Sequence, residues 1–413
     1  MNTPSKPNIS QLTWIRQGAR PATGGQVEGI QDKEVVGAVR AIAPHPVNPD
    51  IVYIGAVNGG IWSTTTARGN SPKWEHLTGQ MQSSSIGALS FDPTDPSHQT
   101  LVAATGRFSS NRRIGGNLLG VLRSTDGGMT WKIHDHNGAF RSVHFTSIIA
   151  RGNVIVTSAN TTDHFRSDDY GLRWEPIAQL PGSGLPSGIA FDVAGDPSNV
   201  NRLFTHVGDS GIFRSDDIGA TWQKVSNAAI ENLMRLGACN VRIAVGNNNN
   251  VFVAIAAAGS DRLAGVFRSG DGGSTWAALD VPQSRERSSA TFGIHPGGQA
   301  RIHLSLAADP NNDEIVYIGG DRQPAFDEGD NLAPRMAFPN SIGARDYSGR
   351  LFRINSSLAA GSQASHITHS NTQANSAPHA DSRDLKFAAD GILLEADDGG
   401  IFRRTAPQRN DGD

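Results

Sequence analysis

The chain has 413 residues and a nearly balanced charge, with 36 Lys and Arg against 39 Asp and Glu. This balance gives no general electrostatic attraction to nucleic acid or to an anionic membrane. The single cysteine, Cys239, excludes an internal disulfide framework and a multi-cysteine metal site. No apolar run approaches the roughly 18 residues that span a bilayer, and the polar first residues contain no apolar signal segment. The sequence therefore predicts no nucleic-acid partner and no membrane span.

Short apolar segments dominate the chain from its start. Residues 11–16 read as a strand that has no companion strands before it. Three further strands are predicted before Trp74, at residues 38–43, 51–55 and 60–63. Their alternation of apolar and polar residues is typical of half-buried β-strands. With 47 glycines in the chain, this pattern favours many short strands joined by tight turns.

A motif of the form S-x-D-x-G-x-[TR]-W follows in four gapless copies, which we call the repeat turns: residues 124–131, 167–174, 215–222 and 269–276. Asp and Ser side chains accept backbone N–H groups in tight hairpins, and Gly supplies the positive φ that such turns need. The Trp ring is large enough to pack between neighbouring sheets. Because an apolar strand precedes each copy, the motif is predicted to be the turn between two outer strands.

The spacing of the repeats predicts a propeller. Successive motif tryptophans are 43, 48 and 54 residues apart, close to the roughly 40–50 residues of a four-stranded propeller blade. After the fourth copy, a sixth blade is predicted with an insertion at residues 321–350, and a seventh from residue 384 onward that lacks its outermost strand. We therefore predict an all-β fold, a seven-bladed β-propeller of four-stranded antiparallel blades, whose seventh blade is closed by residues 11–16.

The four repeat turns resemble the Asp box, or bacterial neuraminidase (BNR) repeat, of sialidases, sortilin-type receptors and xyloglucanase-type glycoside hydrolases. The resemblance implies a propeller and an extracellular or cell-envelope location, although no signal peptide is visible and a cytoplasmic location is the alternative. It leaves the activity open, because the same turn serves unrelated functions. Two domain organisations also stay open: a single propeller over residues 1–413, or the N-terminal propeller of a longer two-propeller protein.

The phase of the repeat predicts where a binding site lies. Connections between second and third strands should gather at the end of the blades opposite the repeat turns, beside the starts of the innermost strands and the central channel. Charged side chains are frequent in these segments. Solvated loop charges and ion pairs account for roughly half of them without any ligand. From the remainder we predict ligand-binding roles for Arg107, Arg112, Asp321, Arg322, Arg383 and Asp398.

Candidate chemistry concentrates in the seventh blade. Asp381, Asp397 and His379 could support acid–base catalysis. Glycoside hydrolysis needs two carboxyl groups roughly 5–9.5 Å apart, a separation that sequence does not give. In the sixth-blade insertion, Asp327 and Asp330 offer the hard oxygen ligands that Ca²⁺ prefers, with a solvated acidic loop as the alternative. No other cofactor is predicted.

Two functions compete on these observations. Binding of a polar glycan or a protein partner on the charged face is the leading prediction, and a xyloglucanase-like glycoside hydrolase is the alternative. Xyloglucanase-type enzymes use a cleft between two propellers, whereas this chain holds one predicted propeller. The repeat phase also assigns six of the seven Trp residues to blade packing, which leaves few aromatic platforms for a polysaccharide. A sialidase is disfavoured because the Arg-Ile-Pro motif of that family is absent and only four Tyr are present.

Overall fold

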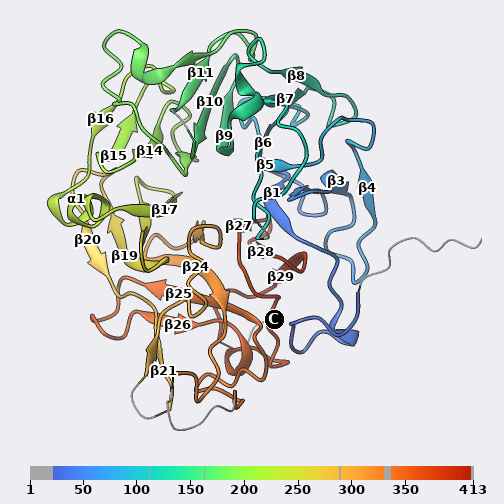
Figure 1. Ribbon diagram of the computed structural model, residues 1–413, viewed down its shortest axis with the longest axis vertical. Coiled ribbons are helices and arrows are strands. Elements are labelled where there is room, and N and C mark those ends of the chain that lie inside the picture. Colours follow the sequence, from blue (N-terminus) through green and yellow to red (C-terminus); the bar gives the residue numbers. More distant parts are fainter. Residues whose placement is uncertain (1–21, 111, 162, 288–289, 330–335, 411–413) are drawn as a thin grey trace, which may run out of the picture.

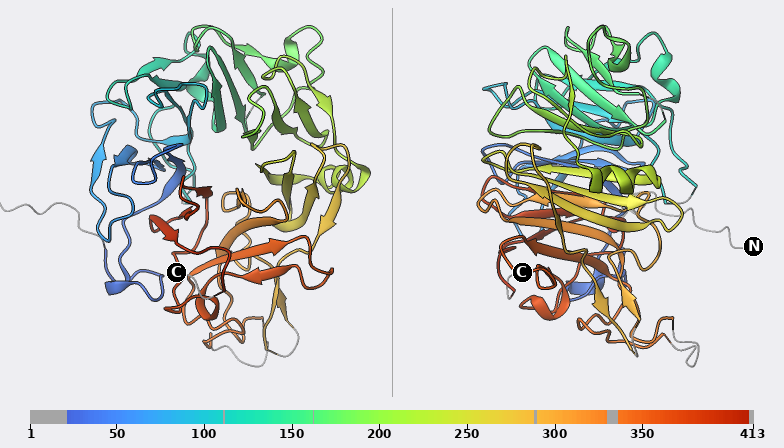
Figure 2. Two further views of the ribbon diagram at one scale, coloured as in Figure 1. Left: turned by 180° about the vertical axis from the view of Figure 1, so that it is seen from behind. Right: turned by 90° about the vertical axis from the view of Figure 1, so that its left-hand side faces the viewer.

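Seven antiparallel sheets surround a central channel in the computed structural model (Figure 1). The structure describes residues 22–410 except for 111, 162, 288–289 and 330–335. Six sheets have four strands, and the seventh has three among the described residues. Viewed from the edge, the ring is a thick disc (Figure 2). The predicted all-β, seven-bladed propeller is confirmed, and no helix in the described part of the chain is long and apolar enough to cross a membrane.

The blades follow one another in chain order, each beginning with its innermost strand. Blade one comprises β1 (Val39–Pro44), β2 (Val52–Ala56), β3 (Gly60–Thr64) and β4 (Trp74–His76). Blade two comprises β5 (Ile86–Phe91), β6 (Leu101–Thr105), β7 (Val121–Ser124) and β8 (Lys132–His134). Blade three comprises β9 (Phe145–Arg151), β10 (Val154–Ala159), β11 (Phe165–Ser167) and β12 (Glu175–Pro176). Blade four comprises β13 (Val193–Gly195), β14 (Leu203–Val207), β15 (Gly211–Ser215) and β16 (Gln223–Lys224). Blade five comprises β17 (Ala238–Val245), β18 (Val251–Ala257), β19 (Arg262–Ser269) and β20 (Ala277–Leu279).

Blade six comprises β23 (Ser305–Ala308), β24 (Ile315–Arg322), β25 (Gly349–Asn355) and β26 (Ala364–His366). Blade seven comprises β27 (Asp384–Phe387), β28 (Leu393–Ala396) and β29 (Ile401–Arg404). Outside the blades lie a small hairpin, β21 (Ser284–Arg285) with β22 (Thr291–Phe292), and the helix α1 (Ala228–Arg235). Short 3₁₀ turns occur at Gln31–Lys33, Ala139–Ser142, Ile177–Gln179 and His369–Asn371.

The core is divided into layers between successive blades. In β1, Val39 and Ile42 pack against residues of blade seven, including Leu394. Ala41 and Ala43 point the other way and join a cluster with residues of blade two. Because side chains alternate along a strand, each inner strand supplies apolar groups to both of its neighbours. This alternation makes the ring continuous and leaves the channel to be lined by the inner strands.

The repeat turns connect the third and fourth strands of blades two to five. In blade four, the Ser215 hydroxyl donates to Asp217 at 2.8 Å and accepts the Gly219 N–H at 2.8 Å. Asp217 also accepts from the N–H and the hydroxyl of Thr221, at 2.8 and 2.6 Å. Trp222 donates to the Gly219 carbonyl and packs in the cluster between blades three and four. The predicted positions of this turn and of its Trp are therefore found.

The start of the described chain holds the two ends of the ring together. Residues 22–37 precede β1 and lie against blades six and seven. Glu28 pairs with Ala377 in an isolated bridge, and its carboxylate accepts the Arg345 N–H at 2.9 Å. The Val36 N–H donates to the Gly399 carbonyl at 2.7 Å. The predicted closing strand, residues 11–16, lies outside the described residues, so that prediction is not tested.

The long connection of blade six runs from residue 323 to residue 348, between β24 and β25. It packs against the β21–β22 hairpin, which the sequence did not predict. Arg350 is fully buried there and donates to Ser284, to the Gly293 carbonyl and to Gln323. Glu286 of the hairpin accepts hydrogen bonds from Ser341 of the connection, at 2.8 and 2.7 Å. Buried polar contacts thus fix this connection to blade six.

Candidate functional site

The connection between β6 and β7, residues 106–120 with 111 not described, links four blades at one end of the channel. We call it the channel loop. Its Ser110 hydroxyl donates to Asp398 of blade seven at 2.7 Å and lies 3.2 Å from Nε2 of His303, which precedes β23 of blade six. The Arg107 N–H donates to Nδ1 of His144, which precedes β9 of blade three, at 3.1 Å. The loop therefore lies over the starts of the inner strands, on the end opposite the repeat turns; we call this end the loop face.

Arg383 fastens the channel loop to blade seven. Its side chain is 1% exposed and lies just before β27. Nε donates to Asp398 at 2.5 Å, Nη1 to the Phe108 carbonyl at 2.7 Å, and Nη2 to Ser110 at 2.8 Å. Burial alone would raise the pKa of Asp398, but the charge and hydrogen bond of Arg383 hold it below its usual value. Two predicted ligand-binding residues are thus brought together as an ion pair between a buried arginine and a partly exposed aspartate.

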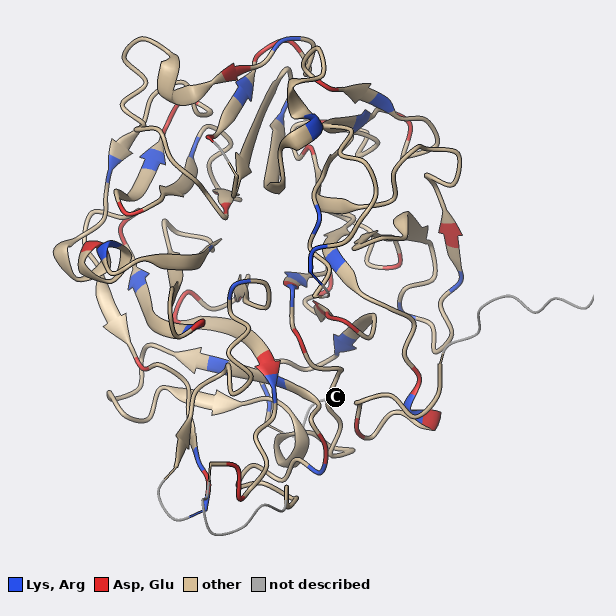
Figure 3. Ribbon diagram, in the orientation of Figure 1, with Lys and Arg blue, Asp and Glu red and all other residues tan. Residues whose placement is uncertain are grey.

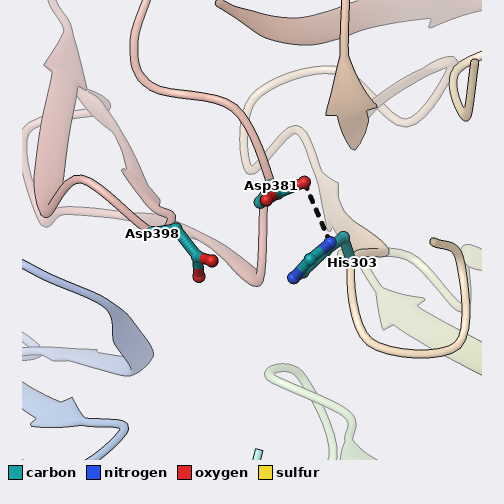
Figure 4. Close-up of side chains that lie close together, drawn as sticks. All are labelled: His303, Asp381 and Asp398. Carbon is teal, nitrogen blue, oxygen red and sulfur yellow. Dashed lines mark ion pairs between the residues drawn. The ribbon is translucent and has the colours of Figure 1, made fainter. Parts of the chain in front are cut away.

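A histidine and two carboxylates meet beside this pair (Figure 4). The His303 side chain is fully buried, and its Nδ1 lies 3.0 Å from a carboxylate oxygen of Asp381. The two atoms are not aligned as a hydrogen bond, and neither has another hydrogen-bond partner among the described residues. One ligand atom each from His303, Asp381 and Asp398 lies within 4.8 Å of the others. Imidazole and carboxylate are ligand types that divalent metals use, so these residues could hold a cation.

The backbone at Asp381 is unusual. Its φ of 79° lies in the left-handed region, which residues other than Gly seldom adopt. This conformation sits where the chain turns from blade six into β27, next to His303. Strained backbone of this kind gathers at functional sites. His303 is not among the predicted site residues; the available signal was its position immediately before a predicted inner strand.

Asp321 and Arg322 end β24 close to the same cluster. The Asp321 carboxylate is buried and accepts the N–H groups of Gly297, Gln299 and Arg322, at 3.2, 3.2 and 2.7 Å. Burial, with the neighbouring charge of Asp381, raises the pKa of Asp321 to about 6. Arg322 forms a two-pronged ion pair with Glu328, with contacts of 2.8 and 2.6 Å. Both side chains therefore have internal partners.

A second carboxyl pair is buried inside blade seven. One Asp397 oxygen accepts the N–H groups of Gly399 and Gly400 at 2.7 and 2.8 Å, while the other has no hydrogen-bond partner among the described residues. Burial raises the pKa of Glu395 to about 8, and burial with the charge of Glu395 raises that of Asp397 well above its usual value. Both carboxyls are therefore harder to ionise than exposed ones.

The three predicted catalytic residues do not form one hydrogen-bonded group. Asp381 lies beside His303, and Asp397 is buried in blade seven, where the charge of Glu395 raises its pKa. Nδ1 of His379 contacts the Ala380 carbonyl at 2.9 Å. No hydrogen bond or ion pair joins the three within the described part of the chain. Their catalytic role stays a prediction.

The remaining predicted residues lie on the loops. Arg107 donates to the Gly116 carbonyl within the channel loop at 2.9 Å, and Arg112 is exposed on the same loop. Asp327 is buried in the blade-six connection, where it accepts the Ala337 N–H at 2.7 Å. Asp330 lies outside the described residues. The calcium site at Asp327 and Asp330 therefore stays a prediction. Charges of both signs are spread around the ring and meet near its centre (Figure 3).

Below the channel loop, the ring encloses a cavity of about 760 Å³. All seven inner strands line it: β1, β5, β9, β13, β17, β23 and β27. Arg40, Asp192, Arg242, Arg383 and Asp384 line its loop end, and prolines together with Arg151, Asp196 and Lys386 line the end near the repeat turns. The volume lies within the range of small-molecule sites.

Comparison with known proteins finds similarity at the level of fold. No protein-family model and no curated protein sequence matches the chain. Among solved structures, it is similar to the GH74 xyloglucanase from Xanthomonas campestris, with 19% identity over 94% of this chain and 54% of that chain and a TM-score of 0.60. It is also similar to the GH74 enzyme of Niastella koreensis, with 16% identity over 94% of this chain and 55% of that chain and a TM-score of 0.61. For the structure of YCF48 bound to D1 peptide, the identity is 12% over 90% of this chain and 94% of that chain, with a TM-score of 0.51. The chain thus spans about half the length of the GH74 chains, and at these identities the similarity shows the fold alone.

Proposed function

We propose that the protein is a ligand-recognising propeller that binds a polar glycan or a protein partner on its loop face. The observation that carries the proposal is the meeting of His303, Asp381 and Asp398, from two blades, beside a loop that comes from a third. Nδ1 of His303 and a carboxylate oxygen of Asp381 face each other at 3.0 Å as an ion pair, but neither atom makes a hydrogen bond to a described residue. Buried polar atoms are normally hydrogen-bonded, so this geometry favours an external hydrogen-bond partner.

A glycoside hydrolase is the second candidate. In its favour are the fold similarity to GH74 enzymes and the raised pKa of Glu395 and Asp397, because such hydrolysis requires one carboxyl to stay protonated. Against it, Asp397 is fully buried and already binds two backbone N–H groups. The chain also spans about half of each GH74 chain, so their activity does not transfer to it. Binding is the better-supported proposal.

We also infer that the four repeat turns are Asp boxes. The inference is supported by the contacts that all four share: the Ser hydroxyl donates to Asp, the Asp carboxylate accepts the N–H of the residue before Trp, and the Trp indole donates to the Gly carbonyl. With this inference goes the proposal of an extracellular or cell-envelope location. A polysaccharide ligand would agree with that location.

The proposal is tested by measuring retention on a panel of neutral and acidic polysaccharides together with the sugar released from each. Asp381→Asn is expected to weaken retention at least tenfold, because it removes the charge that faces His303. Leu172→Ser, an exposed position in a repeat turn at the opposite end, is the control and should retain wild-type binding. An equal loss in the control, or release of sugar that stops in Asp397→Asn, contradicts the binding proposal.

A further inference from the structure

Arg40 enters the channel at an irregular position of β1. Val39 pairs with Ala56 and Ala41 pairs with Gly55, so Arg40 is the extra residue of a β-bulge and has no partner on β2. Bulges re-aim side chains and are frequent next to functional sites. Regular alternation would place Val39 and Ala41 on the same face of blade one, whereas with the bulge between them they join the cores on opposite sides of the blade. The Arg40 side chain lines the channel cavity instead.

Two nitrogens of the Arg40 guanidinium are buried without hydrogen bonds to the described residues. The residue is 5% exposed, and both Nε and Nη1 are buried with no hydrogen-bond partner among the described residues. Its Cζ lies 4.3 Å from the centre of the Phe108 ring, which covers it from the channel loop. An arginine presents five N–H donors, and a buried charge without hydrogen bonds is strongly unfavourable. This arrangement therefore requires an acceptor that the described chain does not supply.

Other buried arginines of this protein show the usual solution. Arg350 uses its three nitrogens on four acceptors, and Arg383 uses its three on Asp398, Phe108 and Ser110. Arg40 differs from both. Two of its nitrogens are buried without a hydrogen bond among the described residues, at a position that faces the cavity.

The charged side chains that line the cavity are five cations and three carboxylates: Arg40, Arg151, Arg242, Arg383 and Lys386 against Asp192, Asp196 and Asp384. Burial, together with the charges of Arg242 and Arg383, lowers the pKa of Arg40 well below its usual value, while Asp384 and Asp192 act in the opposite direction. Each of these carboxylates also accepts a backbone N–H: Asp384 from Ile42 at 2.9 Å, and Asp192 from Ile243 at 3.0 Å. An anion would relieve the repulsion between the arginines as well as satisfy the free donors.

We propose that the channel binds a small oxyanion, a carboxylate or phosphate group, through the Arg40 guanidinium with Arg242 facing the same cavity. Arginine binds both groups through two parallel N–H···O bonds. The cavity of about 760 Å³ is lined by Arg40 and Arg242 at this end and by Pro44 and Phe387 at the other, whereas the channel loop does not line it. The anion therefore reaches Arg40 from the end near the repeat turns. This site is separate from the ligand proposed for the loop face.

The test is isothermal titration of the full chain with sodium phosphate and, separately, with sodium acetate, each at constant ionic strength set with chloride. Wild type should bind at least one of the two, and the stronger identifies the group. Arg40→Met keeps the length of the side chain and removes its charge, and it should weaken binding at least tenfold. Arg141→Met, at a side chain that is 75% exposed on the surface, should bind like wild type.

Stability measurements keep the test independent of folding defects. Arg40→Met removes a buried charge without hydrogen bonds, so its melting temperature in chloride alone should equal or exceed that of wild type. Arg40→Lys keeps the charge but loses the guanidinium group that makes two parallel N–H···O bonds. It should therefore bind phosphate or acetate more weakly than wild type. Absence of binding by wild type to both anions overturns the proposal, and so does binding that is unchanged in Arg40→Met and Arg40→Lys. If Asp381→Asn loses the ligand of the loop face but still binds the anion, the result supports an anion site at Arg40 that is separate from the loop face.

Discussion

Glu395 and Asp397 show how burial can change the chemistry of a carboxyl group. Burial raises the pKa of both carboxyls, and the charge of Glu395 raises the pKa of Asp397 further, whereas Asp397 acts to lower that of Glu395. A carboxyl whose pKa is raised by folding binds protons more tightly in the native state than in the unfolded state. The stability it contributes is complete below the unfolded pKa of roughly 4.3 and is lost as the pH rises toward the folded value of about 8.

We therefore expect the protein to lose stability between about pH 5 and pH 8, by up to about 1.4 kcal/mol for each pH unit over which one proton is released. Glu395→Gln removes one of the two titrating groups and should flatten this dependence. The free energy of unfolding measured in urea at pH 5, 6.5 and 8 checks it. A variant that keeps the wild-type slope would show that the pair does not titrate in this range.

Individual contacts were the part of the site least accessible to prediction. The repeat phase placed Asp321, Asp381, Arg383 and Asp398 on one face, and the structure brings them near one another. The closeness of Asp381 to His303 depends on a left-handed backbone at Asp381, and the burial of Asp397 depends on the two glycine N–H groups that follow it. Neither feature has a signature in residue type, so sequence alone could not separate the carboxylates that face the cluster from the one that faces the blade interior.

At the level of elements, the repeat turns were the most predictable part of the chain because their contacts are local. Each Asp accepts hydrogen bonds from residues within four positions of it, and each Trp donates to a carbonyl three positions earlier. The β21–β22 hairpin is the opposite case. Its strands have two residues each and are held by Arg350 and by contacts of Glu286 with Ser341, which are distant in sequence.

Asp217→Ala tests the structural role of the repeat turn. The Asp217 carboxylate accepts three hydrogen bonds in the turn of blade four, so its loss should cost about 1–3 kcal/mol of unfolding free energy. Asp209→Ala, at an exposed position of the same blade, is the matched control and should change it by no more than about 0.5 kcal/mol. Urea unfolding followed by tryptophan fluorescence measures both. Equal effects of the two substitutions would show that the turn contacts add nothing specific.

At the level of the whole molecule, closure of the ring depends on contacts between the two ends of the chain. Glu28 lies at the centre of these contacts, with the Arg345 N–H, the Ser348 hydroxyl and Nδ1 of His369 at 2.9, 3.2 and 3.3 Å from one of its oxygens. Burial opposes ionisation, but His369 and these hydrogen bonds hold the pKa of Glu28 below its usual value. The charged form therefore stabilises the closed ring.

Glu28→Gln should lower the free energy of unfolding at pH 7 by roughly 1–3 kcal/mol. Because the folded pKa is depressed, the stability from Glu28 is present above the unfolded value of roughly 4.3 and is lost as the pH falls through the folded value. The difference between wild type and variant should therefore shrink below pH 4. Thermal unfolding at pH 7 and at pH 3.5 makes the comparison. A difference that is unchanged at low pH would assign the effect to packing rather than to the charge.

The proposed closure of blade seven by residues 11–16 remains to be tested. If that strand completes the sheet beside β29, a chain that begins at residue 22 should melt at least several degrees below the full chain. Differential scanning calorimetry of the two proteins decides this. Equal melting temperatures would contradict closure by residues 11–16 and leave residues 22–37 as the contact between the ends.

The number of blades followed from the sequence because seven similar strand patterns can be counted along the chain. The path of the channel loop did not, because it is set by contacts with blades three, six and seven rather than by its own residues. A loop that crosses the opening changes which residues a ligand meets. Arg383 becomes a support for the loop, and the exposed part of the site shifts toward Asp381, Asp398 and the loop itself.

The central claim, that the loop face binds the ligand, is tested most directly by hydrogen–deuterium exchange of the full chain with and without the polysaccharide that it retains best. The account predicts slower exchange in residues 106–120, 379–383 and 397–399, with the repeat turns unchanged. Slower exchange confined to residues 124–131, 167–174, 215–222 and 269–276 would contradict it.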